Sequence, residues 1–356
     1  MNMTASSGIT APRVDERGVR MVAMALYGYP AVLVAHEVGL FARLAEKPQS
    51  LADLAEHLRL HPRSVDVMLG VSAAVGLLET DGSRWSLTPL AEDYLLRDKP
   101  TYWGGYLDYM IANPSLYSFE SIRNTLLTNL PQATKGEPPA SGTIRDPSRL
   151  WSVHDRHAER AAAFTRWMHS TSIGPALHWP DSIDLSAHRR MLDIGGGSGA
   201  HSIGAALRWP ELQARVFDLA PVCEVAREYI SEHGLAGRID TIAGDYWKDS
   251  FPESDLHFYS LIHHGFSRER CLELTNKSFR SLPSKGRIIA HGIFFDDDRT
   301  GPFSAAAINV MMAILHNEGR EYSGVEIAAM LTEAGFEKVE QTRTVGDWRI
   351  VTAVKP

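Results

Sequence analysis

The residues best suited to chemistry form a glycine run at 195–199, which directly follows an apolar segment. This run belongs to MLDIGGGSGAHS, residues 191–202. Glycines let the backbone turn tightly and let a ligand approach it without meeting side chains, so a strand, this turn and a helix predict a nucleotide-type site. Gly195, Gly197 and Ala200 also satisfy the dinucleotide pattern G-x-G-x-x-G/A, so the glycines alone leave NAD and other adenosine ligands open.

Two acidic residues follow the glycine turn, each at the end of a further predicted strand. Asp218 lies in VFDLA, where a carboxylate can accept hydrogen bonds from both ribose hydroxyls of either kind of cofactor. Asp245 lies in AGDYW, where it can accept from an adenine amino group while the ring of Tyr246 or Trp247 packs on the base. A second acid at this position favours S-adenosylmethionine as the ligand.

From residue 190 onward, segments with the apolar spacing of a strand alternate with segments that have the spacing of a helix. These are the elements that must position the glycine run and the two acidic residues. Strands are expected at MLDI, ARVFDL, RIDTIA, DLHFYSLI and RIIAHGIFF, with two closing strands near Val339 and Arg349. Helices are expected after Gly199, from Val222, from Glu269 and around 325–334. Strands that alternate with helices predict an α/β fold with a parallel, doubly wound sheet.

The N-terminal part has the pattern of a winged helix. Apolar residues recur at helical spacing over 19–44, with a turn or kink expected at 28–30. Two short helices follow, the second expected over 63–78, and Asp81 and Gly82 then mark a hairpin. Because the second helix exposes only Arg63 as a DNA-reading side chain, dimerisation or lid formation is the favoured use of this unit.

Composition narrows the class of protein. The chain has 356 residues, 44% of them hydrophobic, and its formal net charge of -7 disfavours nucleic acid and anionic lipid as partners. Two cysteines exclude a disulfide framework and suit a reducing compartment, so we expect a cytoplasmic protein. The longest apolar stretch, 21–35, is interrupted by Gly28 and Pro30, so we expect no membrane segment or signal peptide. A loose arm is expected over the first dozen residues and a surface loop over 131–148.

The sequence resembles the class I S-adenosylmethionine-dependent small-molecule O-methyltransferases with an N-terminal winged-helix dimerisation domain, such as those acting on acetylserotonin, caffeate and polyketides. The resemblance covers nearly the whole chain. It rests on LDIGGGSG at 192–199, FDL at 217–219, GDYW at 244–247, IHHGFSRERC at 262–271, LPSKGRII at 282–289, EGREYSG at 318–324 and EAGF at 333–336.

The resemblance implies a Rossmann-like, mostly parallel seven-stranded sheet whose last strand is antiparallel, and a substrate pocket roofed by helices of the first domain. It divides the chain into a winged-helix dimerisation domain at 13–100, a helical linker and substrate lid at 101–187, and a cofactor-binding methyltransferase domain at 188–356. It implies a homodimer. The matching cofactor-binding positions are Asp193, Gly195, Gly197, Asp218, Leu219, Gly244, Asp245, Tyr246 and Ser260.

The same resemblance places His264, seven residues before Cys271, at the position of the family's catalytic base. His263 and His264 are expected to end a strand, where neighbours point to opposite faces, so only one can readily face the ligand. Methyl transfer requires that two reactants be aligned and a proton removed, which a histidine does well near neutrality. A phenol and a histidine differ by about 3.5 pKa units, roughly 5 kcal/mol, which the sulfonium charge and concerted displacement must offset.

Several positions depart from the family pattern. Glu321 matches one of the two glutamates that brace the base, but the other falls at Gly292, immediately after the candidate catalytic residue His291. Ser260 stands where a lysine is common, and Gly265 and Phe266 replace the usual Asp and Trp. These departures bear on proton abstraction more than on cofactor binding.

We therefore predict an S-adenosylmethionine-dependent methyltransferase that O-methylates a small aromatic or polyketide-like metabolite. Enzyme alternatives are a C-methyltransferase for an enol or 2-oxo acid and an enzyme that retains the cofactor without methylating; a non-enzyme alternative is a winged-helix regulator that senses the cofactor. No metal is predicted, although His264, His291 and His316 could converge on one and favour carbon methylation. Candidate acceptor-binding residues are Phe164, Trp167, Met168 and Met312, beside Tyr106, Tyr109, Met110, Met311 and Ile314, most of which suit a core equally well.

Overall fold

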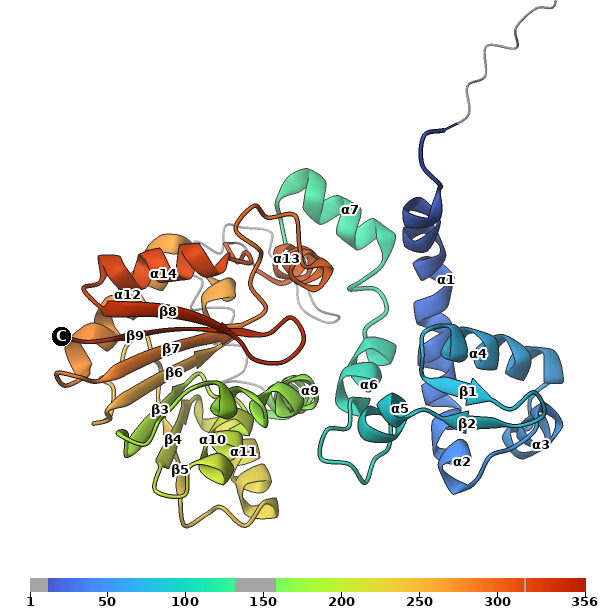
Figure 1. Cartoon of the computed structure of the whole chain (residues 1–356), viewed down its shortest axis with the longest axis horizontal. Coiled ribbons are helices and arrows are strands. Elements are labelled where there is room, and N and C mark those ends of the chain that lie inside the picture. The colour runs from blue at the N-terminus through green and yellow to red at the C-terminus, as the bar shows by residue number, and fades with distance from the viewer. Residues whose placement is uncertain (1–11, 132–157, 317) are drawn as a thin grey trace, which may run out of the picture. The chain divides into compact units, whose positions relative to one another are not determined.

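The computed structural model describes residues 12–131, 158–316 and 318–356 (Figure 1). The chain divides into two compact units, Met1–Tyr102 and Trp103–Pro356. The predicted N-terminal arm and the predicted loop at 131–148 lie almost entirely outside the described residues. The three-part division at 100 and 187 stays a prediction.

The first unit contains the predicted winged helix. Its elements are α1 (Arg17–Glu37), α2 (Leu40–Glu46), α3 (Leu51–Leu58), α4 (Pro62–Ala74), β1 (Leu78–Thr80), β2 (Trp85–Leu87) and α5 (Pro89–Tyr94). Ser50 and Asp53 form a capping box at the start of α3, and Pro62 occupies the first turn of α4, where its missing N–H costs nothing. Strands β1 and β2 pair antiparallel around the Asp81 turn, which confirms the hairpin.

Two boundaries of this unit differ from the prediction. Helix α1 runs through Gly28 and Pro30 without the expected turn, because a proline removes one backbone hydrogen bond and an exposed helix can leave the freed carbonyl to water. Helix α4 ends at Ala74 rather than at residue 78, because Gly76 adopts a left-handed conformation (φ 80°) that stops the helix.

Helix α1 also changes the expectation about membranes. Of the helices that the structure describes, it is the one long and apolar enough to span a bilayer by length and composition, and only 6% of its apolar window is buried. The prediction of no membrane segment is therefore not confirmed. Contiguous exposed apolar side chains of this kind mark an interaction surface.

The second unit is built on a seven-stranded sheet. Its helices are α6 (Gly104–Ala112), α7 (Phe119–Thr128), α9 (Ala158–Ala176), α10 (Ala200–Arg208), α11 (Ala220–Glu232), α12 (Arg268–Ser281), α13 (Phe303–Leu315) and α14 (Gly324–Glu333), with 3₁₀ turns η1 (Trp179–Ser182) and η2 (His263–Gly265). Its strands are β3 (Arg190–Ile194), β4 (Gln213–Asp218), β5 (Ile239–Ala243), β6 (Leu256–Ser260), β7 (Arg287–Gly292), β8 (Glu337–Arg343) and β9 (Arg349–Val354).

The sheet has the order β5-β4-β3-β6-β7-β9-β8, and β9 alone runs opposite to its neighbours. This confirms the doubly wound, mostly parallel sheet with an antiparallel last strand. Strand β3 pairs with β4 on one side and β6 on the other, so the chain reverses its direction of winding there. Ligands of such sheets bind at the carboxyl ends of the strands beside this switch point, where the glycine turn lies.

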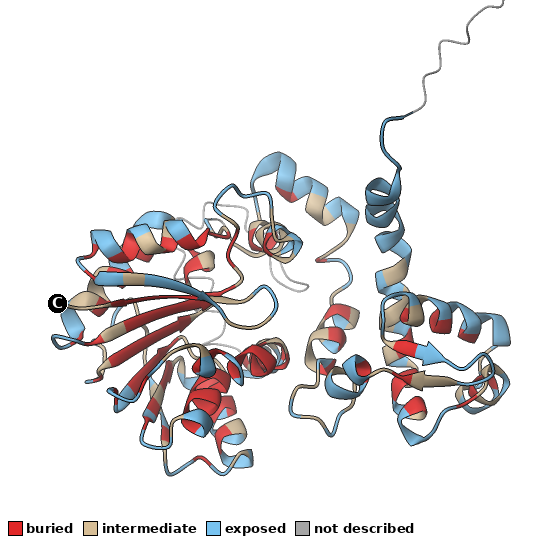
Figure 2. Ribbon diagram, in the orientation of Figure 1, coloured by how far each residue is buried: buried red, intermediate tan, exposed pale blue. Residues whose placement is uncertain are grey.

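Side chains of the central strands alternate between two buried layers. Leu192 and Ile288 belong to the layer that packs with α12 and α14, whereas Met191 and Ile289 belong to the layer that packs with α10 and α11. Figure 1 shows these helix pairs on opposite faces of the sheet, and Figure 2 shows the central strands buried. Near-continuous apolar strands are expected when both faces are covered.

Candidate active site

The glycine loop joins β3 to α10 through backbone angles that favour glycine. Gly195, Gly197 and Gly199 have φ values of 66°, 57° and 76°. A Cβ on Gly195 would lie 2.5 Å from Ile262 Cδ1, and a Cβ on Gly196 would lie 2.7 Å from Asp193 Cγ. The loop therefore exposes bare backbone, and side chains at these glycines would fill the space beside it. We call this glycine loop, residues 195–199, the cradle.

Asp218 is tied to this loop from the end of β4. Its Oδ2 accepts from the Gly197 N–H (2.9 Å), and its Oδ1 accepts from the N–H of Leu219, the residue that caps α11 (2.7 Å). Burial raises the pKa of the Asp218 carboxyl to about 6, although the two backbone hydrogen bonds act against this shift. The carboxylate lies at the edge where the sequence predicts a ribose.

Asp193 lies beneath the loop and is fully buried. Its Oδ2 accepts from the Ser202 hydroxyl (2.8 Å), whereas its Oδ1 has no hydrogen-bond partner among the described residues. Burial raises the pKa of this carboxyl to about 7, with the nearby Asp218 adding to the shift. A buried acceptor without a partner, beside an open cradle and a second carboxylate, fits the polar end of an adenosyl cofactor carrying an ammonium group.

Asp245 follows β5 in a tight turn. Its Oδ1 accepts from the Trp247 N–H (2.8 Å) and its Oδ2 from Lys248 Nζ (2.7 Å). Gly244 donates its N–H to the Asp218 carbonyl (2.9 Å) and packs against the ring of Phe217, which joins the two acidic strand ends. The Asp218 and Asp245 segments therefore lie side by side, as predicted.

The structure distinguishes the two aromatic residues after Asp245. An atom of the Tyr246 ring lies 3.5 Å from the Cβ position of Gly195, so this ring borders the cradle. The Trp247 ring is covered by the Arg270 guanidinium (3.8 Å to the centroid) and meets Phe266 edge to face (5.0 Å). Of the two rings offered for the base, Tyr246 is the one beside the glycine loop.

The two neighbouring histidines do not end a strand as expected. Strand β6 stops at Ser260, Leu261 takes a left-handed conformation (φ 55°), and His263 and His264 begin the turn η2. The argument from strand alternation is therefore wrong, although the two side chains still differ. His263 is buried, which lowers its pKa to about 4, and its ring meets Tyr259 edge to face.

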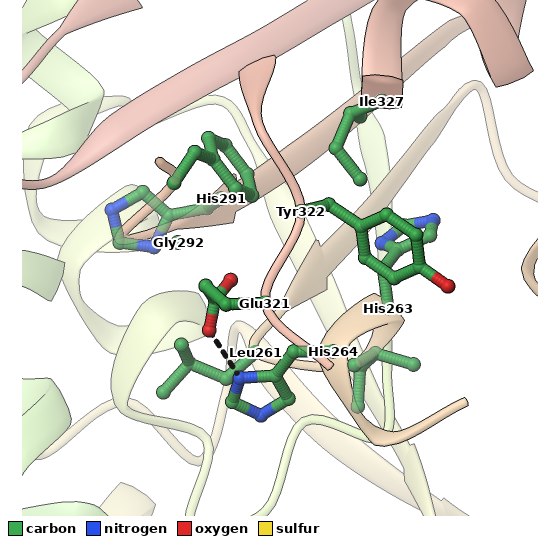
Figure 3. Close-up of a pocket in the computed structure, with 10 residues that line it drawn as sticks. Leu261, His263, His264, His291, Gly292, Glu321, Tyr322 and Ile327 are labelled. Atoms are coloured by element: carbon green, nitrogen blue, oxygen red, sulfur yellow. Dashed lines mark hydrogen bonds and ion pairs between the residues drawn. The ribbon is translucent and has the colours of Figure 1, made fainter. Parts of the chain in front are cut away.

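His264 meets the predicted glutamate. Its Nδ1 lies 3.1 Å from Glu321 Oε2, and the glutamate is only 1% exposed (Figure 3). The backbone N–H of Glu321 donates to Asn309 Oδ1 on α13 (2.8 Å), which fixes the segment that carries the carboxylate. A carboxylate on one ring nitrogen orients the imidazole and leaves the other nitrogen for a proton transfer.

A small cavity of about 10 Å³ adjoins this pair. It is lined by Leu261, Ile262, His263, His264, His291, Gly292, Phe294, Glu321, Tyr322 and Ile327. Glu321 supplies the one carboxylate of this lining. A Cβ on Gly292 would lie 3.0 Å from Phe294 Cε1, so the phenylalanine ring takes up the space beside the position that lacks the family glutamate.

His291 lines the same cavity as His264, but the contacts described for it are with other residues. His291 is buried, its Nδ1 lies 3.0 Å from the Ser260 hydroxyl, and its ring stacks on Trp348 (4.7 Å). Burial, and then the neighbouring His201, hold its pKa well below the usual value. His291 thus holds Ser260, and a direct role at the acceptor has no support from these contacts.

The alternative metal site is not found. Within the described ranges, no group of three or more His, Cys, Asp or Glu side chains is arranged to hold a metal ion. His316 lies beside the turn η2, with its Cε1 3.9 Å from the Cβ position of Gly265, but His291 packs with His201 instead. The three histidines do not converge because β7 turns the imidazole of His291 into a layer of aromatic rings.

The predicted acceptor residues lie on α6, α9 and α13. Trp167 is buried, with Tyr109 of α6 stacked on it at 4.5 Å and Phe164 edge-on at 5.1 Å. Met312 is buried on α13, while Phe164 and Met168 are half-buried. The Trp167 contacts are packing contacts between α6 and α9, so the half-buried pair keeps more surface for an acceptor.

Sequence reasoning missed several side chains that shape the site. Ile262 lies against Gly195, Phe294 lies against Gly292, and Ser198 of the glycine loop bonds to His169 Nδ1 of α9 (2.8 Å). Ile262 and Phe294 are apolar residues in apolar segments, so no sequence signal separates them from core residues. The polar Ser198 and His169 are 29 residues apart, and only folding brings them together.

Comparison with known proteins follows the same division of the chain. A model described as an O-methyltransferase domain matches residues 138–337, and a model described as an O-methyltransferase dimerisation domain matches 25–97. The chain is 31% identical to the 3-hydroxy-5-methyl-1-naphthoate 3-O-methyltransferase of Streptomyces sahachiroi, over 96% of each chain. It is 27% identical to the L-tyrosine C(3)-methyltransferase of Streptomyces lavendulae, over 91% of this chain and 87% of that protein.

A solved structure shares the fold. Human N-acetylserotonin methyltransferase, solved in complex with S-adenosylmethionine, matches with a TM-score of 0.80 and 24% identity, over 97% of this chain and 99% of the human chain. The fold of this chain thus recurs in a solved protein.

Proposed function

This chain belongs to the family of S-adenosylmethionine-dependent O-methyltransferases, and from that premise we propose that it methylates a hydroxyl group of a small aromatic metabolite, with His264 as the general base. The proposal rests chiefly on the contact between His264 Nδ1 and Glu321 Oε2, which lie 3.1 Å apart. This contact is close to the carboxyl edge of the sheet, where the cradle also lies. The relative that acts on a hydroxynaphthoate supports an aromatic acceptor.

We assign a different part of the cofactor to each of the residues around the cradle. We assign the ribose to Asp218, the adenine to Asp245 and Tyr246, and the ammonium end to Asp193, with the backbone of Gly195 and Gly197 beneath. When bound, S-adenosylmethionine supplies an electrophilic methyl group on a positively charged sulfur. The protein has then to bring an acceptor oxygen in line with that methyl group and remove a proton.

The proton leaves through His264. Glu321 accepts the Nδ1–H of the imidazole, so the Nε2 lone pair is free to take the acceptor hydroxyl proton, and the buried carboxylate then stabilises the imidazolium that forms. His291 fixes the Ser260 hydroxyl at the end of the adjacent strand, where it can contact the cofactor. His291 therefore acts as a positioning residue in this proposal.

Transfer of an isotopically labelled methyl group to hydroxylated benzoic and naphthoic acids tests the proposal. We expect label in a methoxy group of the product, and we expect the His264→Ala variant to lose that transfer while it still binds S-adenosylhomocysteine. Full activity in the variant would remove the role of His264, and labelled transfer only to nitrogen or carbon would overturn the O-methylation.

Carbon methylation is the second candidate, because Gly292 and Phe294 leave one carboxylate rather than two in the cavity beside His264. A matched relative named as a C(3)-methyltransferase of tyrosine supports it. An activated ring carbon loses its proton after the methyl group arrives, so a weaker base suffices. Carbon-13 NMR of the labelled product separates an aryl methyl from a methoxy carbon. The non-methylating enzyme and the winged-helix regulator gain no support from the site.

We further propose that the functional unit is a homodimer in the cytoplasm. The dimerisation-domain match at 25–97 includes part of α1, whose apolar side chains are exposed. Val19, Val22, Leu26 and Tyr29 recur at helical spacing and form an apolar stripe that a second copy can cover. The two free, buried cysteines suit a reducing compartment.

A further inference from the structure

The loop at 244–251 carries the acid assigned to the adenine amino group, and its conformation matters for that reason. Within the loop, the Asp245 N–H donates to Asp249 Oδ2 (2.8 Å), and the N–H groups of Lys248 and Asp249 donate to the Asp245 carbonyl. These bonds close a single turn. They do not by themselves fix where that turn stands relative to the glycine loop.

The Gly244 N–H joins the start of the loop to the Asp218 carbonyl, and helix α12 supplies a second attachment through Lys277. Its Nζ donates to the carbonyl of Tyr246 (2.6 Å) and to the carbonyl of Asp249 (2.5 Å), which lie on the two sides of the turn. The same ammonium group lies 4.3 Å from the centre of the Phe251 ring. One charged group therefore joins three residues of the loop to a helix that packs on the sheet.

A second cation on the same helix holds the next part of the loop. Arg270 precedes Lys277 by two helical turns, so both side chains leave α12 on one face. The Arg270 guanidinium covers the Trp247 ring at 3.8 Å and also pairs with Glu273 (3.2 Å). The backbone on both sides of Trp247 is thus fixed from outside the cofactor site.

We propose that Lys277 is a positioning residue for adenine recognition, acting through the Tyr246 and Asp249 carbonyls to hold the Asp245 carboxylate at the adenine amino group. Arg270 assists by holding Trp247. The inference rests on the assignment of Asp245 made under the proposed function. It concerns the cofactor's base alone, because Lys277 contacts neither the His264 turn nor Glu321 in the contacts described above.

The test compares S-adenosylhomocysteine with S-inosylhomocysteine, in which an oxygen replaces the adenine amino group. Wild-type protein should prefer the adenosyl compound by calorimetry. In Lys277→Met the loss of two charged hydrogen bonds should cut that preference by about 10-fold, with kcat at saturating cofactor within about twofold of wild type. Lys277→Arg, which keeps donors at the site, should restore most of the preference.

Two further variants make the outcome decisive. Arg280→Met removes an exposed cation from the same helix and should leave the preference unchanged. Asp245→Asn should abolish the preference directly. If Asp245→Asn abolishes it while Lys277→Met keeps it, the positioning role of Lys277 is wrong; if Asp245→Asn keeps it, the adenine assignment itself fails and the inference falls with it.

Discussion

At the residue scale, burial shifts the pKa values of the groups that we assign to the cofactor. Asp193 and Asp218 sit in the same apolar edge of the sheet, and burial raises their pKa values to about 7 and about 6. The histidines respond oppositely, because burial disfavours the charged imidazolium and lowers the pKa of His263 to about 4. The acids therefore titrate near neutrality, while the buried histidines stay neutral.

Cofactor affinity should fall as the pH falls through the Asp218 pKa. The ionised carboxylate accepts hydrogen bonds from the ribose hydroxyls, and a raised pKa means that the free protein takes up a proton near pH 6. Below that pH the Kd for S-adenosylhomocysteine should rise by up to about 10-fold per pH unit. Calorimetry between about pH 5 and 8 measures this change. A flat affinity over the whole range would contradict the assignment.

The His264 and Glu321 pair should act as one unit in catalysis. Glu321→Gln keeps an acceptor oxygen but removes the negative charge that stabilises the imidazolium, and it should lower kcat by roughly 100-fold, with cofactor affinity unchanged. The His264→Ala and Glu321→Gln double variant should be no slower than His264→Ala alone, because the glutamate acts through the imidazole. Glu337→Gln, on the exposed strand β8, serves as the control. Additive losses would show that Glu321 works independently of His264.

At the element scale, the β3–α10 turn and helix α12 position the residues that we assign to the cofactor. The turn presents backbone N–H groups at the start of α10, and α12 holds the adjacent acid loop through Lys277 and Arg270. The turn η2, rather than the end of β6, presents His264, since the left-handed Leu261 ends the strand early. The glycine loop, the Asp245 turn and the His264 turn thus each follow a strand of the sheet, whereas Glu321 lies between α13 and α14.

Gly195→Ala should lower the free energy of unfolding more than an alanine substitution at an unstrained glycine does. A Cβ there meets Ile262 at 2.5 Å and the residue has a φ of 66°, so the free energy of unfolding should fall by about 1–3 kcal/mol and cofactor binding should weaken. Gly237→Ala is the matched control, because no atom lies within 4 Å of its added Cβ and its φ is not positive. Urea unfolding and calorimetry measure both effects. Equal behaviour of the two variants would refute the steric argument.

At the scale of the whole molecule, two units have separate tasks. The sheet unit contains the cradle, the acid loop and the His264 pair, whereas the first unit carries an apolar helix, α1, whose side chains are mostly left exposed by the residues that the structure describes. Val19, Val22 and Leu26 are exposed by 77%, 72% and 68%. A soluble monomer rarely exposes such a stripe, which favours a covering partner.

Charges placed on the α1 stripe should separate the dimer. Size exclusion with light scattering should show a dimer for the wild type and a monomer for Val22→Glu with Leu26→Glu, because a buried interface cannot solvate two carboxylates. Ser64→Glu adds a charge at an exposed polar position of α4 and should remain dimeric. A monomeric wild type, or a dimeric double variant, would undo the role given to α1.

Local patterns in the sequence determined the cradle and the order of its elements. The glycine run follows strand β3, Asp218 ends β4 and Asp245 lies just after β5, and parallel strands bring such ends to one edge of a sheet. The pairing of His264 with Glu321 rested instead on family resemblance, because 57 residues separate them.

Tertiary structure alone decided which neighbours those residues have. In the folded chain Tyr246 rather than Trp247 lies beside Gly195, the His291 ring lies against the Ser260 hydroxyl, and the Phe294 ring lies against Gly292. Tertiary structure also brought Lys277 to the acid loop, 31 residues after Tyr246 in the chain. The periodicity of apolar residues and the residue types that favour turns are local, so they can be seen within a single segment. The partners of a side chain depend on how separate segments pack together, and a single segment does not encode that packing.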